Sequence, residues 1–206
     1  MQFPIVPART AMLFFDALNV YLHPKDPEVK AAVEHSGVLV AMQKINQAAR
    51  DAGIAVFYAQ ADHRPDFKDF APHIVDRGHQ QASPEPYKTT PPAAVSGSWE
   101  AEIVPELAPQ SGDYVIKKHR WSSFFQTHLE LSLRTAGIDT IMLAGGSTEV
   151  GIASTAYAAR DLDFNLIVLR DACRSGRAGV DDFFAEQVFP VFTRVMTVDQ
   201  AIAAIQ

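Results

Sequence analysis

The sequence predicts an α/β fold, a three-layer α/β/α sandwich around a mostly parallel sheet. Several short segments are apolar at every position, which is typical of strands buried on both faces. They alternate with longer segments in which apolar residues recur at helical spacing, and this alternation implies right-handed crossovers with helices on both faces. At 206 residues with 48% hydrophobic content, the chain can bury one sizeable core. We therefore expect a single domain over residues 1–206.

The first half of the chain predicts two strands joined by a long helix. Residues 11–15 are apolar and are followed by Asp16, so they predict a buried strand with a polar residue at its carboxyl end. Residues 54–58 predict a second buried strand. The intervening residues 29–52 predict a helix that ends at Gly53, because one apolar stripe runs along it, formed by Val38, Met42, Ile45 and Ala49.

The second half continues the alternation. It predicts strands at 114–116, 140–144 and 166–169 and helices at 129–135 and 148–161. Near the C-terminus, four aromatic residues recur at spacings that suit a helix packed into the core, namely Phe183, Phe184, Phe189 and Phe192. An oligomer interface is the alternative interpretation of these residues.

Residues 61–112 interrupt the alternation. The segment shows little periodicity and has prolines at positions 65, 72, 84, 86, 91, 92, 105 and 109. A long irregular insertion in a compact domain is usually a lid or binding loop, or else disordered. We expect a loop that covers the site, with disorder as the alternative.

Charge and composition narrow the range of partners. The formal net charge is −6 and no basic run is present, which argues against nucleic acid and against an anionic membrane surface. No window approaches the roughly 20 apolar residues needed to span a bilayer. The one cysteine, Cys173, excludes an internal disulfide and fits a reducing compartment. We therefore expect a cytoplasmic protein that acts on a small molecule.

Three positions far apart in the sequence are predicted to meet at one edge of the sheet. Asp16, Lys118 and Gly151 each lie at or just beyond the carboxyl end of a predicted strand, where α/β proteins bind ligands. Alone, Asp16 could equally be a turn or cap residue and Lys118 an exposed charge. The turn at 145–148 joins a strand to a helix, whose first N–H groups can bind developing negative charge. An ordinary turn with a serine or threonine cap is the alternative.

Three segments carry a resemblance to a known family. They are Ile141–Ile152, which contains Gly-Gly-Ser-Thr-Glu-Val-Gly, then Phe14-Phe15-Asp16, and Lys118–Phe125. Together they resemble the isochorismatase-like hydrolases, also called the cysteine hydrolase superfamily, over nearly the whole chain. The resemblance implies the three-layer fold, a catalytic group of aspartate, lysine and cysteine, and a homodimer or homotetramer. It also implies a cis peptide at Gly146–Ser147 that aims backbone N–H groups at the substrate oxygen.

Gly151 stands at the position of the family's nucleophilic cysteine. A glycine offers no nucleophile, and Cys173, predicted after a different strand, is expected to be a buried small residue. Glycine lowers helix propensity, so its presence early in a helix predicts that space is kept there for substrate or water. The same replacement occurs in the isochorismatases of this superfamily, so the resemblance implies an aspartate that acts as general acid on an enol ether.

Further residues are candidates for substrate binding. Gln60 resembles a glutamine that contacts substrate in the isochorismatases, while His63 and Arg64 are candidates for recognising an anionic group. Trp121, beside His119 and Arg120, either shapes the pocket or packs against the core.

The insertion also contains possible metal ligands, namely Asp62, His63, His73 and His79. Nicotinamidases of the superfamily bind a metal through an aspartate and histidines of this region. Their aspartate and first histidine are separated by one residue, whereas Asp62 and His63 are adjacent. We expect no metal and no cofactor.

These observations lead to a hydrolase of a small polar or anionic molecule that works without a covalent cysteine. Asp16 would be acid or base, Lys118 its electrostatic partner, and the Gly146–Ser147 turn the oxyanion site. A charged lysine favours ionised Asp16 and burial opposes it, so the sequence leaves the choice between acid and base open. The alternatives are an amidohydrolase with water as nucleophile and a non-catalytic ligand-binding module.

Overall fold

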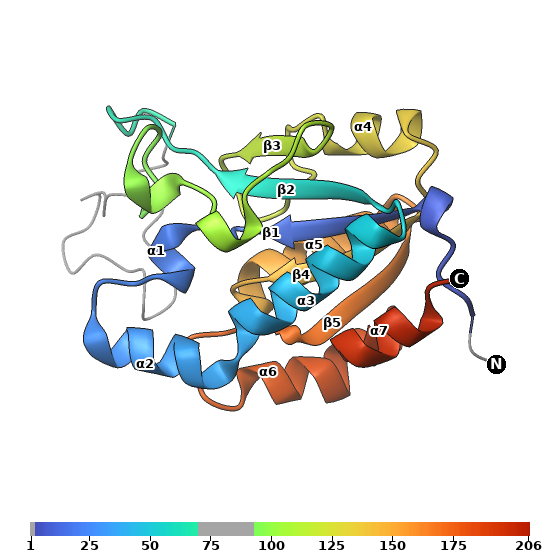
Figure 1. The fold of residues 1–206 in the computed structure, drawn as a ribbon. Coiled ribbons are helices and arrows are strands. Elements are labelled where there is room, and N and C mark those ends of the chain that lie inside the picture. The colour runs from blue at the N-terminus through green and yellow to red at the C-terminus, as the bar shows by residue number, and fades with distance from the viewer. Residues whose placement is uncertain (1–2, 70–92) are drawn as a thin grey trace.

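The computed structural model describes residues 3–69 and 93–206. Their strands form one sheet in the order β3-β2-β1-β4-β5-β6, in which every pair of neighbours is parallel. Figure 1 shows β1 in the middle of the molecule, with β2 and β4 beside it. The strand bounds are β1 (Thr10–Phe15), β2 (Ala55–Ala61), β3 (Tyr114–Lys118), β4 (Thr140–Gly145), β5 (Asn165–Cys173) and β6 (Arg194–Met196).

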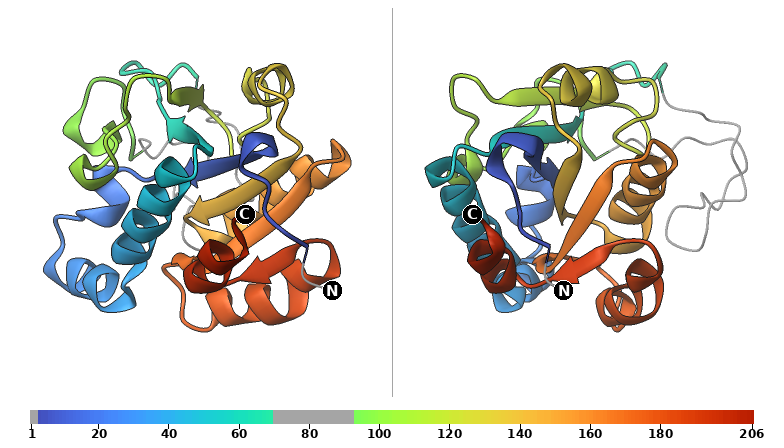
Figure 2. Two further views of the ribbon diagram at one scale, coloured as in Figure 1. Left: turned by 45° about the vertical axis from the view of Figure 1, so that its right-hand side comes forward. Right: turned by 90° about the vertical axis from the view of Figure 1, so that its right-hand side faces the viewer.

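Two helical layers cover the sheet, as Figure 2 shows, so the predicted three-layer α/β/α fold is confirmed. One face packs against α2 (Pro27–Ser36), α3 (Val38–Asp51) and α7 (Val198–Ala204). The other face packs against α4 (Leu129–Thr135) and α5 (Ala153–Asp161). Each strand serves both layers, because alternate residues point to opposite faces. In β1, Met12 and Phe14 join the first core, whereas Leu13 and Phe15 join the second.

The predicted helix over 29–52 is two helices rather than one. The break is at Gly37, whose φ of 68° places it in the left-handed region that ends helices. α2 begins at Pro27 after Asp26, whose carboxylate accepts hydrogen bonds from the first turn. The predicted apolar stripe is buried and belongs entirely to α3.

The later elements also differ from the prediction in detail. The helix expected over 148–161 begins with a π-helical turn, η4 (Thr148–Ile152), and continues as α5. The C-terminal aromatic segment consists of three short pieces, α6 (Val180–Phe183), η5 (Phe184–Val188) and η6 (Phe189–Val191). Phe189 is buried as expected, but Phe183 is 56% exposed, so the prediction that all four phenylalanines pack into the core is wrong for Phe183.

The described ends of the 61–112 insertion lie against the carboxyl ends of β1 and β2. Isolated bridges join Leu18 to Ile103 and His63 to Val95. Apart from the end of β2, the regular structure described there consists of two 3-10 turns, η2 (Trp99–Ala101) and η3 (Pro105–Leu107). Residues 70–92, with His73 and His79, lie outside the described residues. The remaining elements are η1 (Pro7–Arg9) and α1 (Asn19–Leu22).

The strand order determines where a ligand can bind. From β1 the chain builds outward to β2 and β3, and then returns to the other side of β1 to form β4. Ligands of open α/β sheets bind at the carboxyl end of the strands beside such a reversal. Here that point lies between Asp16, which follows β1, and the turn that follows β4. Among the described helices, none is long and apolar enough to cross a membrane.

Candidate functional site

Asp16 and Lys118 are in direct contact. Lys118 Nζ donates a hydrogen bond to Asp16 Oδ2 at 2.8 Å, and the backbone N–H of Ala61 donates to Asp16 Oδ1 at 2.8 Å. Asp16 is 8% exposed and Lys118 is 4% exposed. Because Ala61 ends β2 and Lys118 ends β3, the carboxyl ends of three adjacent strands meet at this carboxylate.

The backbone of Asp16 has an uncommon conformation. Its φ is 47°, in the left-handed region that aspartate tolerates better than most residues. Its own N–H donates to the carbonyl of Ala59 at 2.8 Å, and its carbonyl accepts from the N–H of Leu18 at 2.7 Å. Such backbone angles cost free energy and occur preferentially at functional sites.

Burial determines the protonation of Asp16. Removal from water raises the pKa of the Asp16 carboxyl, and the charge and hydrogen bond of Lys118 lower it by less. The net direction is upward, which favours a carboxyl that can hold a proton.

The turn after β4 approaches β1 closely. Gly145 lies opposite Phe15 in the sheet, with φ 138°, and an ideal Cβ there would lie 2.1 Å from the carbonyl oxygen of Phe15. The peptide bond between Gly146 and Ser147 is cis. Ser147 makes no side-chain cap, and the Thr148 hydroxyl donates to Asp181 instead of capping the helix. The alternative of an ordinary serine or threonine cap is therefore wrong.

The space beside Gly151 is filled by the ring of Phe15. An ideal Cβ on Gly151 would lie 2.2 Å from Phe15 Cε1, and Phe15 is only 2% exposed. The expectation that Gly151 leaves space for substrate or water is therefore wrong. Glycine is needed because the aromatic ring occupies the volume that a side chain at position 151 would take.

Cys173 is unsuited to act as a nucleophile. It is the last residue of β5 and pairs with Gly145, so it lies nearer the edge of the sheet than the sequence suggested. Its thiol is buried, and burial raises its pKa well above the ordinary value. A thiol that stays protonated is a poor nucleophile.

The predicted substrate-binding residues lie in different environments. Gln60 is buried, and its amide nitrogen donates to the carbonyl of Ala101 at 2.6 Å, which ties β2 to η2. Arg64 is exposed and forms an ion pair with Asp66. Trp121 is 59% exposed, so it does not pack in the core. A substrate contact remains a prediction for each of the three.

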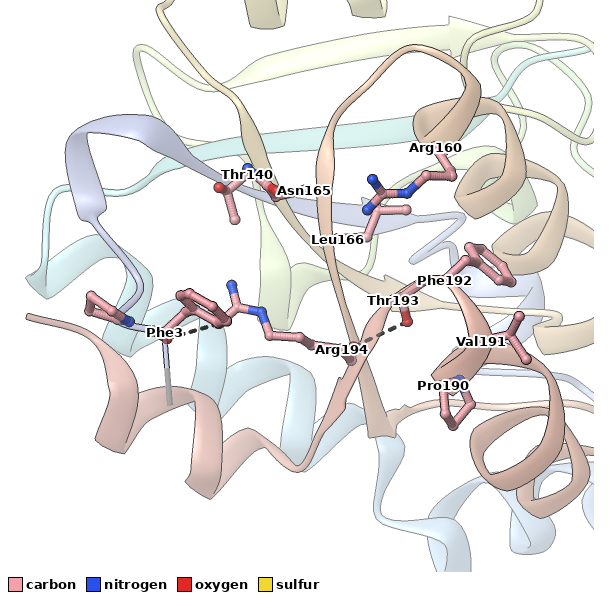
Figure 3. Close-up of a pocket in the computed structure, with 11 residues that line it drawn as sticks. Phe3, Thr140, Arg160, Asn165, Leu166, Pro190, Val191, Phe192, Thr193 and Arg194 are labelled. Atoms are coloured by element: carbon pink, nitrogen blue, oxygen red, sulfur yellow. Dashed lines mark hydrogen bonds between the residues drawn. The ribbon is translucent and has the colours of Figure 1, made fainter. Parts of the chain in front are cut away.

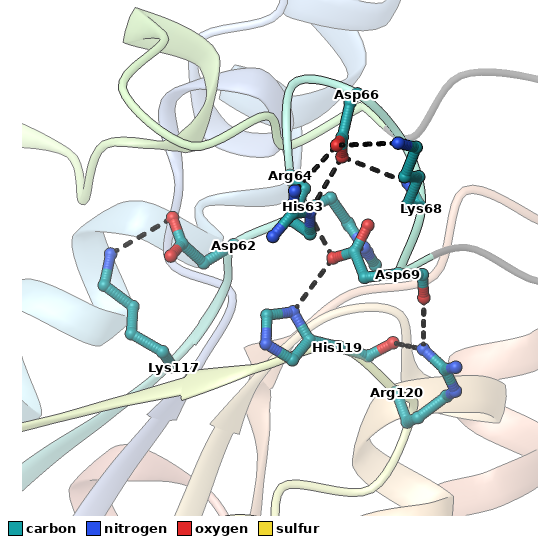
Figure 4. Close-up of polar contacts among 9 residues, drawn as sticks. All are labelled: Asp62, His63, Arg64, Asp66, Lys68, Asp69, Lys117, His119 and Arg120. Atoms are coloured by element: carbon teal, nitrogen blue, oxygen red, sulfur yellow. Dashed lines mark hydrogen bonds and ion pairs between the residues drawn. The ribbon is translucent and has the colours of Figure 1, made fainter.

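A second polar cluster surrounds Asp69, as Figure 4 shows. Asp69 Oδ2 lies 3.3 Å from His63 Nδ1 and 3.2 Å from His119 Nδ1, and it accepts the N–H of Arg64 at 3.1 Å. Asp69 Oδ1 is buried and has no hydrogen-bond partner among the described residues.

His63, Asp69 and His119 are the described residues that could hold a metal ion. Burial lowers the pKa of His63, which favours the neutral imidazole that metals require. Of the possible ligands considered from the sequence, only His63 belongs to this set. Asp69 and His119 were not considered, because they come from separate segments of the chain. Their meeting is a tertiary contact that local spacing does not reveal.

A cavity of about 670 Å³, drawn in Figure 3, lies at the amino ends of β4, β5 and β6. Its lining includes Thr140, Asn165 and Arg194, the first residues of β4, β5 and β6. Because Asp16 and Lys118 are at carboxyl ends, this cavity is separate from their contact.

Comparison with known proteins places these features in a family. Residues 10–200 match the family model described as the isochorismatase domain. The isochorismatase family protein YecD of Escherichia coli is 33% identical over 156 residues, which cover 76% of this chain and 77% of that protein. The ureidoacrylate amidohydrolase RutB of Methylobacterium radiotolerans is 29% identical over 194 residues, covering 86% and 75% of the two chains.

Solved structures agree with this match. An isochorismatase family protein from Burkholderia thailandensis has a TM-score of 0.78 at 26% identity, covering 98% of both chains. The N-carbamoylsarcosine amidase from Thermoplasma acidophilum has a TM-score of 0.72 at 26% identity, covering 93% of this chain and 97% of that one. The chain therefore belongs to the isochorismatase-like hydrolase superfamily.

Proposed function

We propose that this protein hydrolyses a small polar or anionic organic molecule with water as the nucleophile and without a covalent intermediate on the enzyme. The buried contact between Asp16 and Lys118, beside a Gly151 whose side-chain space is filled by Phe15, carries this proposal. The contact between Asp16 and Lys118 supplies an acid–base group with a charged partner. The Phe15 ring leaves no room for a nucleophilic side chain at position 151.

Asp16 is the general acid in this mechanism. Burial favours its protonated form, which gives its proton to the double-bond carbon of an enol ether. Water adds to the resulting oxocarbenium carbon and returns a proton to the Asp16 carboxylate, and the hemiketal then breaks its C–O bond to release an alcohol and leave a carbonyl compound. Lys118, 2.8 Å from Asp16 Oδ2, stabilises the carboxylate that remains. The backbone N–H groups at the start of η4 would hold an anionic group of the substrate, because the first turn of a helix leaves such groups without partners in the helix.

Hydrolysis of a C–N bond is the second candidate function. The relatives that favour it are RutB, named a ureidoacrylate amidohydrolase, and the N-carbamoylsarcosine amidase. In this reaction Asp16 would be ionised and would act as base toward the attacking water. Without a thiol, attack on an amide is the harder of the two reactions.

A substrate screen separates these candidates. Purified protein would be incubated with panels of enol ethers, N-carbamoyl amides and activated esters in ¹⁸O-labelled water, with Asp16→Asn as the blank. We expect Asp16-dependent cleavage of enol ethers with ¹⁸O in the product. Cleavage of carbamoyl amides alone would support the second candidate. Ligand binding without any turnover would support a binding module and contradict both.

A further inference from the structure

Gly151 is required by a close contact and not by its backbone conformation. Its φ is not among the positive values of this chain, so other residues could adopt its backbone shape. An ideal Cβ there would nevertheless lie 2.2 Å from Phe15 Cε1 and 2.4 Å from Phe15 Cζ. Contacts this short do not occur between packed carbon atoms. A side chain at position 151 and the Phe15 ring therefore compete for one space.

The packing around Phe15 holds its ring in that space. Phe15 ends β1 and belongs to the core beneath α5, together with Ile152. At its backbone it faces Gly145, where an ideal Cβ would lie 2.8 Å from the carbonyl carbon of Phe15. Two glycines thus accommodate one phenylalanine, Gly145 at the backbone and Gly151 at the ring.

The same ring contacts Lys118. Lys118 Nζ lies 4.1 Å from the centroid of the Phe15 ring while it donates to Asp16 Oδ2 at 2.8 Å. An ammonium group is attracted to the face of an aromatic ring, most strongly where water is excluded. The ring therefore contacts the catalytic pair on one side and Gly151 on another.

We propose that Phe15 is a positioning residue that occupies the space of a nucleophilic side chain. Its ring fills the volume that a side chain at position 151 would need and holds the Lys118 ammonium on Asp16. The effect on the Asp16–Lys118 pair rests on the proposed function, whereas the competition for space does not.

A double-mutant cycle in thermal unfolding tests the shared space. Phe15→Val removes ring atoms from the core, and Gly151→Ala forces a methyl group against the ring, so each change should lower the melting temperature by several degrees. In the Phe15→Val background, Gly151→Ala should instead raise the melting temperature, because the methyl group enters the vacated space. Equal effects of Gly151→Ala in both backgrounds would overturn the proposal.

Gly176→Ala is the matched control. No atom lies within 4 Å of an ideal Cβ at Gly176, and its φ is not positive, so this change should have the same small effect in both backgrounds. If Gly151→Ala alone does not yield folded protein, recovery of folded protein by adding Phe15→Val counts as the same coupling. Failure of the double variant to recover would count against it.

Amine labelling tests the contact with Lys118. Folded wild type and variants would be treated with an acetylating reagent, and the modification of each lysine would be followed by peptide mass spectrometry. Phe15→Val should label Lys118 severalfold faster than wild type. Lys117, whose side chain is 48% exposed, should react at the same rate in all proteins and serves as the internal control. An unchanged rate at Lys118 would reject the positioning role.

The double variant separates positioning from simple packing. Phe15→Val with Gly151→Ala should regain stability while Lys118 stays reactive, because alanine fills the space but has no aromatic face. Restoration of both properties would mean that Phe15 has only a packing role. Neither measurement uses a substrate, so failure of the proposed hydrolytic reaction would leave this test intact.

Discussion

At the scale of single residues, the site depends on one buried carboxyl, that of Asp16, whose pKa is raised by one influence and lowered by another. Burial raises the pKa of Asp16, while Lys118 and the N–H of Ala61 lower it. The sequence could place Asp16 and Lys118 near each other, because both follow predicted strands. It could not tell which influence is larger, because burial depends on the segments that pack around the carboxyl.

Removal of the acid should abolish most of the activity. Asp16→Asn keeps the shape of the side chain but cannot donate a proton in the same way, so kcat should fall by about 10²-fold or more. Substrate binding, measured by calorimetry, should persist. Lys44→Ala, which removes an exposed ion pair with Asp199, is the control and should leave kcat nearly unchanged. Full turnover by Asp16→Asn would remove Asp16 from the mechanism.

The pH profile should show the ionisation of Asp16. Because the acidic form is active, kcat should be high at low pH and fall as pH rises through the raised pKa. Lys118→Met removes a charge that lowers this pKa, so the fall should move to higher pH. A fall that stays in place or moves to lower pH in Lys118→Met would contradict this assignment.

The same ionisation should affect stability. The folded pKa of Asp16 lies above its ordinary value of 3.8, so the folded state holds this proton more tightly than the unfolded state. Its contribution to the free energy of unfolding is full below that ordinary value and is lost as pH rises through the folded pKa. Urea unfolding at a series of pH values would give the difference in the free energy of unfolding between wild type and Asp16→Asn. If the folded pKa is not raised, this difference should not fall as pH rises.

The buried thiol should be dispensable. Cys173→Ser should retain most of the activity and lose roughly 1 kcal/mol of stability, as expected for a small change in the core. Iodoacetamide should leave the folded wild type active, because burial raises the pKa of Cys173. Stoichiometric inactivation that substrate prevents would show that the thiol takes part in the reaction.

At the scale of elements, sequence patterns predicted five of the six described strands, missed the short β6, and failed at particular contacts. The residues of β1 are apolar throughout, and their burial on both faces follows from that pattern. The break at Gly37 was missed because the apolar stripe that predicted the helix lies entirely in α3, which begins at Val38, and so carries no information about the preceding residues. Gly151 was recognised as unusual, but the residue that fills its space lies in a distant strand. His119 and Asp69 likewise meet only through the tertiary fold.

The turn after β4 should tolerate no side chain at Gly145. Its φ of 138° disfavours other residues, and an added Cβ would lie 2.1 Å from the carbonyl oxygen of Phe15. Gly145→Ala should therefore lower the free energy of unfolding by about 3 kcal/mol or more. Gly176→Ala, which meets no atom within 4 Å, should change it by about 0.5 kcal/mol at most. Similar urea midpoints for the two variants would contradict this interpretation.

At the scale of the whole molecule, the fold class was predictable because strand–helix alternation allows few arrangements. The single domain and the homodimer or homotetramer remain predictions. Sedimentation velocity over a range of protein concentrations would decide the oligomeric state, and a monomer at every concentration would contradict the expected assembly.

The strand order also determines how readily each half of the catalytic pair can open. Asp16 follows β1, which has a neighbour on both sides, whereas Lys118 ends β3, at the edge of the sheet. Central strands usually open only with global unfolding, and edge strands open locally. Backbone amides of β1 should therefore exchange with deuterium far more slowly than those of β3. A fluctuation that frees the lysine would then leave the aspartate in place, so loss of the ion pair need not involve loss of the fold.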